Sequence, residues 1–277
     1  MPRTNLIFDM GLHKGEDTDF YLRKGFDVVA FEADPLLIKF CKLRFADHID
    51  KGQLQIIEGA IAPASEGSFV KFYRNAESVW GTIDPGFAKQ NADMGSPSEI
   101  ISVSRVDISE TFERIGIPFY LKIDLEGIEH HVLQCLSEFE DRPKYLSIET
   151  DRIDRVALNE RLNLLARLGY NKFKVVQQAV LPGSSGSFRC LDGSEFSFCF
   201  PKDTSGPFGE EIPQPWISLS ETIREYDAIF KRYGWFGDAS AARRLPFPVR
   251  ALLKSGYMLF SGYRGALPGW HDVHASL

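Results

Sequence analysis

The sequence predicts an α/β fold built on a mostly parallel β-sheet. Through residues 1–200, short runs rich in β-branched and aromatic residues alternate with longer amphipathic segments, the pattern of strand–helix–strand units. Several of the short runs end in an acidic residue, as at Asp9, Glu32 and Asp124. A glycine-punctuated turn at residues 11–15 follows the first run. These features are typical of a sheet that binds its ligand at the carboxyl ends of the strands.

Each element of this fold is predicted from a local pattern. Strands are expected, in chain order, at residues 6–9, 28–32, 54–58, 68–73, 100–104, 119–124, 144–149, 173–178 and 195–201. Helices are expected where apolar residues recur at three- and four-residue spacing, at residues 17–24, 35–45, 127–138, 156–168 and about 218–233. A Gly/Ser-rich connection at residues 183–187, and not a helix, joins the last two strands. Those two strands are therefore expected to pair antiparallel.

Two stretches depart from the alternation. Residues 75–99 are long, mixed and rich in Gly, Pro and Asn, so we expect a lid or a substrate loop there. Residues 202–277 carry one helix and a tail rich in Gly, Pro and aromatic residues. The main domain is therefore placed at residues 1–201. Residues 202–277 are expected to form an appendage that packs on this core and contributes to substrate binding.

Composition narrows the possible partners and compartment. The 277 residues carry 32 Lys+Arg against 38 Asp+Glu, and a net charge of −6 argues against a nucleic-acid partner. No run approaches the ~18 apolar residues of a membrane helix, so no membrane partner is expected. The four cysteines form no C-x-x-C pair, which indicates a reducing compartment and no cysteine-based zinc site. The apolar run at residues 6–8 is too short for a signal peptide, so we expect a cytoplasmic protein. Nothing indicates the oligomeric state.

Acids and glycines at the first two strand ends suggest a nucleoside site. The turn at residues 9–16 lets the backbone approach a ligand closely, although a plain turn between strand and helix would look the same. Glu32 ends the second strand, where a carboxylate can accept both hydroxyls of a ribose. Alone, Glu32 could equally be an acid that favours the start of the next helix. Together the two strand ends indicate a nucleoside-binding switch point.

A third block, Lys-Ile-Asp-Leu-Glu-Gly-Ile-Glu at residues 122–129, ends a later strand. Asp124 and Glu126 are two residues apart, so an extended chain would aim both to one side. Glu129 falls on the apolar face of the helix that follows. Acids crowded at this point bind something or cap the helix, with Glu129 reaching back toward Glu126.

The three blocks at residues 9–15, 30–35 and 122–129 resemble the FkbM family of S-adenosylmethionine-dependent methyltransferases. Supporting matches stand at residues 58–62, 146–149 and 168–170, and the resemblance covers about residues 5–200. It implies a Rossmann-like class I methyltransferase sheet of about seven strands, the last antiparallel, with helices on both faces. The cofactor, S-adenosyl-L-methionine, would lie across the carboxyl ends of the strands.

The resemblance also implies roles for single residues. The first loop would hold the amino-acid part of the cofactor, Glu32 the ribose, and residues 58–60 the adenine. The expected cofactor-binding residues are Asp9, Met10, Gly11, Lys14, Gly15, Glu32, Ala33, Gly59, Ala60, Asp124 and Leu125. No metal site is assigned, although His271, Asp272 and His274 could supply two imidazoles and a carboxylate to a cation.

Family substrates imply O-methylation of a hydroxyl on a sugar, glycan or natural product. Such a reaction needs a base, and the candidates in order are Asp124, Glu126, Glu129 and His271. The acceptor, a small molecule or a glycan, would lie between residues 75–99 and the tail beyond Pro201. Its apolar walls would be Trp80, Phe208 and Trp270. Two alternatives stay open: a Rossmann-type NAD-dependent enzyme, and a non-catalytic module that binds S-adenosylmethionine or a nucleotide.

Overall fold

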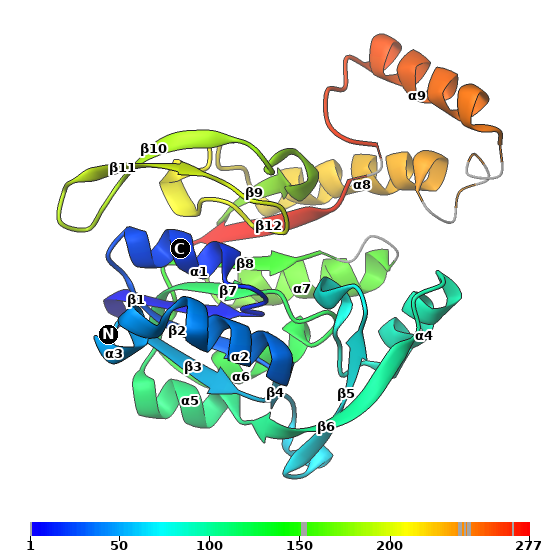
Figure 1. The fold of residues 1–277 in the computed structure, drawn as a ribbon. Coiled ribbons are helices and arrows are strands. Elements are labelled where there is room, and N and C mark those ends of the chain that lie inside the picture. The colour runs from blue at the N-terminus through cyan, green and yellow to red at the C-terminus, as the bar shows by residue number, and fades with distance from the viewer. Residues whose placement is uncertain (1, 151–153, 238–239, 241, 243–244, 268) are drawn as a thin grey trace.

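The computed structural model describes residues 2–150, 154–237, 240, 242, 245–267 and 269–277. Its centre is a seven-stranded sheet with the order β3-β2-β1-β7-β8-β12-β9 (Figure 1). In that order the strands are Leu54–Glu58, Asp27–Glu32, Arg3–Met10, Pro118–Ile123, Tyr145–Glu149, His271–Ser276 and Lys172–Gln177. Neighbours from β3 to β8 are parallel, whereas β12 is antiparallel to both β8 and β9. The α/β fold class, with seven strands and one antiparallel strand, is confirmed.

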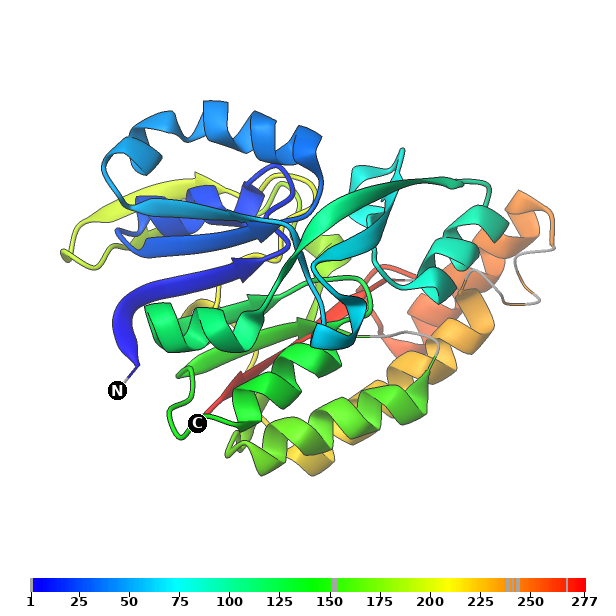
Figure 2. The same cartoon turned by 90° about the horizontal axis from the view of Figure 1, so that it is seen from below.

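Helices cover both faces of this sheet. The alternation of side chains along β1 explains why: Leu6, Phe8 and Met10 belong to one apolar cluster, and Ile7 belongs to another. The first cluster packs under α5 to α8, which span Ile108–Ile115, Glu129–Ser137, Arg155–Arg167 and Leu219–Phe236. In Figure 2, the green helices α5, α6 and α7 lie in front of the sheet. The second cluster packs under α1, α2 and α3, which span Glu16–Arg23, Pro35–Arg44 and Ala46–Asp50.

Side-chain caps fix where several helices begin. The Asp34 carboxylate accepts a hydrogen bond from the Leu36 backbone N–H at 2.8 Å, and Pro35 occupies the first helical position of α2. Ser218 and Glu221 form a reciprocal capping box at the start of α8. The helix starts expected at residues 35 and 218 are therefore correct within a residue.

The strands expected at residues 68–73 and 100–104 exist, but they form a separate three-stranded sheet. Its order is β4-β6-β5, with strands Ala60–Ile61, Ser98–Val106 and Phe69–Asn75. Between β5 and β6 the chain forms a short 3-10 turn at Ser78–Trp80 and the helix α4, Pro85–Asp93. In Figure 1 this segment lies on the side of the molecule where the parallel strands end.

The expected pairing of residues 173–178 with 195–201 is wrong. Residues Glu195–Cys199 form β11, which pairs with β10, Ser185–Arg189, in a hairpin of its own. Phe188, Phe198 and Phe200 of this hairpin region pack around Phe20 of α1, with ring centroids 4.9–5.2 Å from its ring. The partner of β9 is β12, so the last strand of the chain belongs to the central sheet and not to the expected appendage.

A chain that ends at Gly269 is expected to lose its cooperative thermal unfolding transition. The truncation removes β12, which pairs with both β8 and β9 and buries Val273 and Ala275 completely. Losing a central strand leaves two rows of backbone groups unpaired in the interior. Circular dichroism and calorimetry of the truncated and full-length chains test this. A truncated chain with the transition of the full-length protein would contradict the placement of β12. Deleting the tail is therefore not a clean test of a role in substrate binding.

Candidate active site

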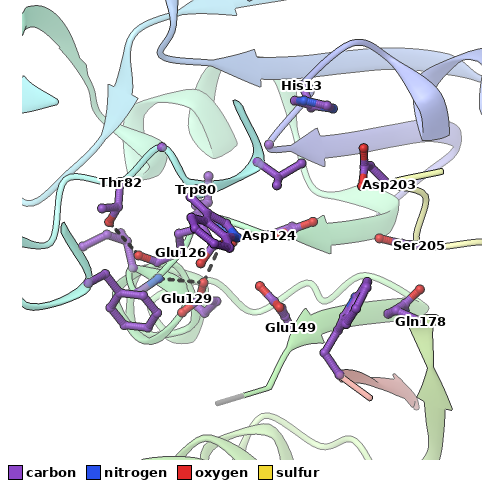
Figure 3. Close-up of a pocket in the computed structure, with 18 of the residues that line it drawn as sticks. His13, Trp80, Thr82, Asp124, Glu126, Glu129, Glu149, Gln178, Asp203 and Ser205 are labelled. Atoms are coloured by element: carbon purple, nitrogen blue, oxygen red, sulfur yellow. Dashed lines mark hydrogen bonds between the residues drawn. The ribbon is translucent and has the colours of Figure 1, made fainter. Parts of the chain in front are cut away.

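A cavity of about 1360 Å³ lies at the carboxyl ends of β1, β2, β7 and β8 (Figure 3). The residues that follow these four strands line it, together with part of the segment between β5 and β6 and one end of α8. This is the edge at which an open α/β sheet binds its ligands. The sequence predicted the same edge from the acids that end the strands.

The Glu32 carboxylate organises one wall of the cavity. Its Oε2 accepts a hydrogen bond from the His13 backbone N–H at 2.8 Å. Its Oε1 accepts from the backbone N–H groups of Ala33 and Asp34 at 2.8 and 2.9 Å. Burial raises the pKa of Glu32 to about 7, against the lowering effect of these three hydrogen bonds. Glu32 is therefore expected to titrate near neutral pH, and its carboxylate is hydrogen-bonded to the first loop through His13.

Gly11 lets the first loop pass directly over the end of β7. Its φ of 94° lies in the region that favours glycine, and a Cβ there would come within 2.1 Å of the Asp124 carbonyl oxygen. Gly59 is confined in the same way, since its Cβ would come within 2.4 Å of the Ser104 carbonyl oxygen. Both glycines line the cavity and leave backbone at its surface. Such a surface suits close approach by a flat or extended ligand.

His13 connects the first loop to the segment between β5 and β6. Its Nδ1 lies 3.1 Å from Glu16 Oε2, and its Nε2 lies 2.8 Å from Ser78 Oγ. Burial acts to raise the pKa of Glu16, but the His13 side chain and the backbone N–H groups of Lys14 and Glu16 together hold it below its ordinary value. The sequence analysis gave His13 no role, because its partner Ser78 is 65 residues away in the chain.

A buried cation holds the acids beneath the cavity together. Lys122 Nζ lies 3.2 Å from Asp9, 3.4 Å from Asp17 and 3.5 Å from Asp124. Burial acts to lower the pKa of Lys122, but these carboxylates raise it well above its ordinary value. Asp9 also accepts a hydrogen bond from Thr18 Oγ1 at 2.6 Å. Asp9 is fully buried and does not line the cavity, so it supports the first loop from below.

The loop after β7 carries the acids that the sequence singled out. Asp124, Glu126 and Glu129 all line the cavity, and Figure 3 shows them together at one end of it. Glu129 Oε1 accepts hydrogen bonds from the backbone N–H groups of Leu125 and Gly127 at 3.3 and 3.0 Å. Glu129 therefore braces the loop that precedes α6, whereas the expected cap through Glu126 is not formed and α6 begins without a side-chain cap. Asp124 and Glu126 are left as the acids of this block that face the cavity interior.

Glu149 of β8 joins these acids. One carboxylate oxygen each from Asp124, Glu126 and Glu149 lies within 4.8 Å of the others, close enough to share a cation. Asp272 lines the same cavity and lies opposite Glu149 in the register of β12 and β8. Burial raises the pKa of Asp272 well above its ordinary value, and the charges of Glu149 and Asp124 add to the effect. The carboxyl ends of β7 and β8 thus form an acidic pole in the cavity.

The trio of His271, Asp272 and His274 does not form a ligand set. Successive residues of a strand point to opposite faces of the sheet, so His271 and Asp272 diverge. His274 is buried, and burial lowers its pKa to about 3. His271 does not line the cavity, which removes it from the positions where a base could meet the acceptor.

The remaining sequence-predicted residues divide between the cavity and the core. The expected cofactor-binding residues that line the cavity are Gly11, Glu32, Ala33, Gly59, Ala60, Asp124 and Leu125. Those that do not are Asp9, Met10, Lys14 and Gly15. Of the expected apolar walls, Trp80 and Trp270 line the cavity, but Phe208 stacks on Tyr120 in the core at 4.2 Å between ring centroids.

Four polar residues of the cavity, Asp17, Thr204, Ser205 and Gln178, were not predicted from the sequence. The Asp17 carboxylate accepts hydrogen bonds from Thr204 Oγ1 at 2.6 Å and from the Ser205 backbone N–H at 2.9 Å. These bonds fix residues 202–205 over the start of α1. Gln178 is 4% exposed, and its side-chain amide has no hydrogen-bond partner among the described residues. A buried amide without a partner is costly, so Gln178 is a point of the cavity wall where a polar partner would be stabilising.

A family model described as the methyltransferase FkbM domain matches residues 9–172. No curated protein matches the chain. Helices of the described residues include none long and apolar enough to cross a membrane.

Solved structures also match. The methyltransferase FkbM from Methylobacillus flagellatus KT is 16% identical, with 63% of this chain and 40% of that chain covered and a TM-score of 0.39. A SAM-dependent methyltransferase from Geobacter sulfurreducens, in complex with S-adenosyl-L-homocysteine, is 10% identical, with 99% and 84% covered and a TM-score of 0.36. The O-methyltransferase TomG from Streptomyces achromogenes is 10% identical, with 70% and 71% covered and a TM-score of 0.33.

Proposed function

Because the chain belongs to the FkbM methyltransferase family, we propose that it transfers a methyl group from S-adenosyl-L-methionine to a hydroxyl group. The acceptor hydroxyl belongs to a sugar, a glycan or a natural product. The observation that carries the proposal is the meeting of three elements at one cavity: the first loop, the Glu32 carboxylate and the acids after β7. The NAD-dependent alternative has no comparable support, since the family match covers the same three elements.

The residues present fit the cofactor. Glu32 offers a carboxylate at the rim of the cavity, where it would accept the ribose hydroxyls. Gly11 and Gly59 leave the bare backbone that a closely held cofactor requires, and a side chain at either position would clash with backbone. When bound, S-adenosylmethionine supplies a methyl group on a sulfonium that is already activated for transfer. The chain must therefore orient an acceptor, take its proton and exclude water.

Asp124 is the base in this proposal. It lines the cavity beside Glu126, and Lys122 Nζ lies 3.5 Å from its Oδ2, which restricts the orientation of the carboxylate. Its backbone N–H also donates to the Met10 carbonyl at 3.0 Å, so the residue is held against the first loop. A carboxylate fixed between the cofactor loop and the acceptor space is placed to take a proton as the new bond forms.

The acceptor occupies the part of the cavity beyond these acids. Trp80 and Trp270 supply flat apolar walls of the kind that stack on sugar rings. Gln178 adds a donor and an acceptor without a partner among the described residues. A wall that combines aromatic rings with an unpartnered amide favours a polyhydroxylated acceptor over a purely apolar one.

S-adenosylmethionine is expected to bind about tenfold more tightly at about pH 8 than at about pH 6. The carboxylate form of Glu32 accepts both ribose hydroxyls, whereas the protonated form offers fewer acceptors. Since the pKa of Glu32 is raised to about 7, the acid is mostly protonated at the lower pH, and binding must first release that proton. Titration calorimetry across this range measures the effect.

Glu32→Gln is the matched control, because the amide keeps the shape of the side chain and cannot ionise. It is expected to flatten the pH profile and to weaken binding at the higher pH by about 1.5–3 kcal/mol. A variant with the wild-type profile would remove Glu32 from the ribose site. Binding of a nicotinamide dinucleotide in place of S-adenosylmethionine would contradict the proposed function itself. Profiling metabolites that gain a labelled methyl group with and without the enzyme then identifies the acceptor.

A further inference from the structure

The helix α9, Phe247–Ser261, has an apolar face that the protein leaves uncovered. In Figure 1 it stands away from the central sheet, beyond α8. Not one of its residues is buried. Its large apolar side chains include Leu252 at 73%, Leu259 at 80% and Phe260 at 91% exposed. Isolated exposed leucines are ordinary on a protein surface, but a continuous face of them indicates a contact with something else.

The exposed residues share one side of the helix. Val249, Leu252 and Leu253 lie one turn apart, and Leu259 and Phe260 continue the same face two turns later. The opposite side holds α9 to the rest of the chain. There the ring of Tyr257 packs on Phe236 of α8 at 5.2 Å between centroids, and Lys254 donates a hydrogen bond to the Leu267 carbonyl. Helix α9 is therefore anchored on one side and open on the other.

The stretch of sequence that contains α9 carries a charge opposite in sign to that of the whole protein. Residues 240–270 contain five basic residues and no acidic ones, whereas the net charge of the chain is −6. The five are Arg243, Arg244, Arg250, Lys254 and Arg264. An apolar helical face flanked by basic residues is the pattern of a helix that lies in the surface of a bilayer with anionic lipids.

We propose that α9 docks this protein on the surface of an anionic lipid bilayer. The leucines and Phe260 would enter the boundary between headgroups and acyl chains, while Arg250 and Arg264 meet the lipid phosphates. Helix α9 is too short to span, at 15 residues, so it would lie along the surface. The proposed docking differs from the sequence-based prediction of no membrane partner. That prediction rested only on the lack of a run long enough to span a membrane.

Docking would also place the cavity beside the lipids. Phe230, Tyr233 and Gly234 of α8 line the cavity, and so does Trp270, which follows α9 in the chain. In the chain, α9 therefore lies between two segments that line the cavity. An acceptor hydroxyl carried on a lipid could then reach Asp124 without leaving the surface, a step that rests on the proposed function.

Co-sedimentation of the full-length protein with vesicles tests the docking without any assay of methyl transfer. Binding is expected to vesicles of equal parts phosphatidylcholine and phosphatidylglycerol, and to be at least tenfold weaker with phosphatidylcholine alone. The triple substitution L252S/L259S/F260S is expected to lower binding by about 100-fold or more. R250Q/R264Q is expected to lower it by about tenfold and to reduce its dependence on salt.

The matched control is L36S/L43S, which removes two exposed leucines from α2 and should leave vesicle binding unchanged. Calorimetry with S-adenosylmethionine should give wild-type affinity for every variant, so a failure of docking is separable from a failure of the proposed function. Equal sedimentation of the triple variant and the wild type would overturn the proposal. So would a wild-type dimer that the same three substitutions dissociate, since it would assign the face to a second copy of the chain.

Discussion

Asp124→Asn is expected to lower the rate of methyl transfer by about 10²–10⁴-fold while S-adenosylmethionine still binds within a few-fold of the wild-type affinity. The amide keeps the size of the carboxylate and can still accept a hydrogen bond, but it cannot take the acceptor proton. Lys122 retains its contacts with Asp9 and Asp17, so the fold should persist. Single-turnover measurements with the identified acceptor separate the chemical step from binding and release.

The neighbouring acids supply the controls for this experiment. Glu129→Gln is expected to affect stability more than rate, because Glu129 is engaged by the backbone N–H groups of Leu125 and Gly127. Glu126→Gln tests the second candidate in the same cluster, and Glu149 is the third. Turnover of Asp124→Asn within a few-fold of the wild type would show that Asp124 only shapes the loop. The base would then be sought at Glu126 or Glu149.

The sequence predicted those residues of the site that follow directly from a local pattern, namely the acids at the ends of strands. Asp9, Glu32 and Asp124 each end a short apolar run, and parallel strands joined by helices bring such ends to one edge. The spacing of these acids in the sequence does not show which of them face the cavity, but the structure does. Asp9 lies under the sheet edge against Lys122, while Glu32 and Asp124 line the cavity. Acids that look equivalent in the sequence therefore have different roles. Asp9 supports the first loop from below, whereas Glu32 and Asp124 face the cavity.

The strand β12 was missed because its pattern resembles an exposed tail. His271–Ser276 alternates polar residues with Val273 and Ala275, which is typical of a strand with one face in water. In the structure every residue of β12 is buried, because β8 and β9 flank the strand and the short turns Gln178–Val180 and Gly209–Glu211 pack against it. The burial of β12 depends on contacts with residues far away in the chain. The local sequence pattern around residues 271–276 therefore could not predict it. The same holds for Gln178 and Asp272, which reach the cavity from distant parts of the chain.

The helix α9 escaped sequence analysis for a different reason. Pro246, Pro248 and Gly256 interrupt or border its apolar pattern, so the segment was assigned to an irregular tail. Pro248 is tolerated because it stands in the first turn, where the backbone N–H needs no partner. The absence of acidic residues through residues 240–270 was visible in the sequence. This absence of acidic residues indicates a membrane-binding surface only together with the exposed position of α9, which the sequence does not show.

Lys122→Met is expected to cost about 3–5 kcal/mol of unfolding free energy, because it leaves buried carboxylates without their shared cation. Lys122 is 4% exposed, and Asp9 has a pKa raised by burial that Lys122 counteracts. The melting temperature should fall by about 10 °C, given the usual 2–4 °C per kcal/mol for a chain of this size. Calorimetry measures the loss directly.

Two further variants show whether the loss comes from uncompensated charge. Asp9→Asn in the Lys122→Met background removes one of the stranded carboxylates, so the double variant is expected to be more stable than Lys122→Met alone. Lys42→Met removes a half-exposed cation that pairs with Glu58, and an exposed pair of this kind should change stability by less than about 1 kcal/mol. If Lys122→Met were as mild as Lys42→Met, the buried acids would be neutral in the folded protein. The cation would then not be what holds the first loop against β7, and Asp124 would depend on its backbone bond to Met10 for its position.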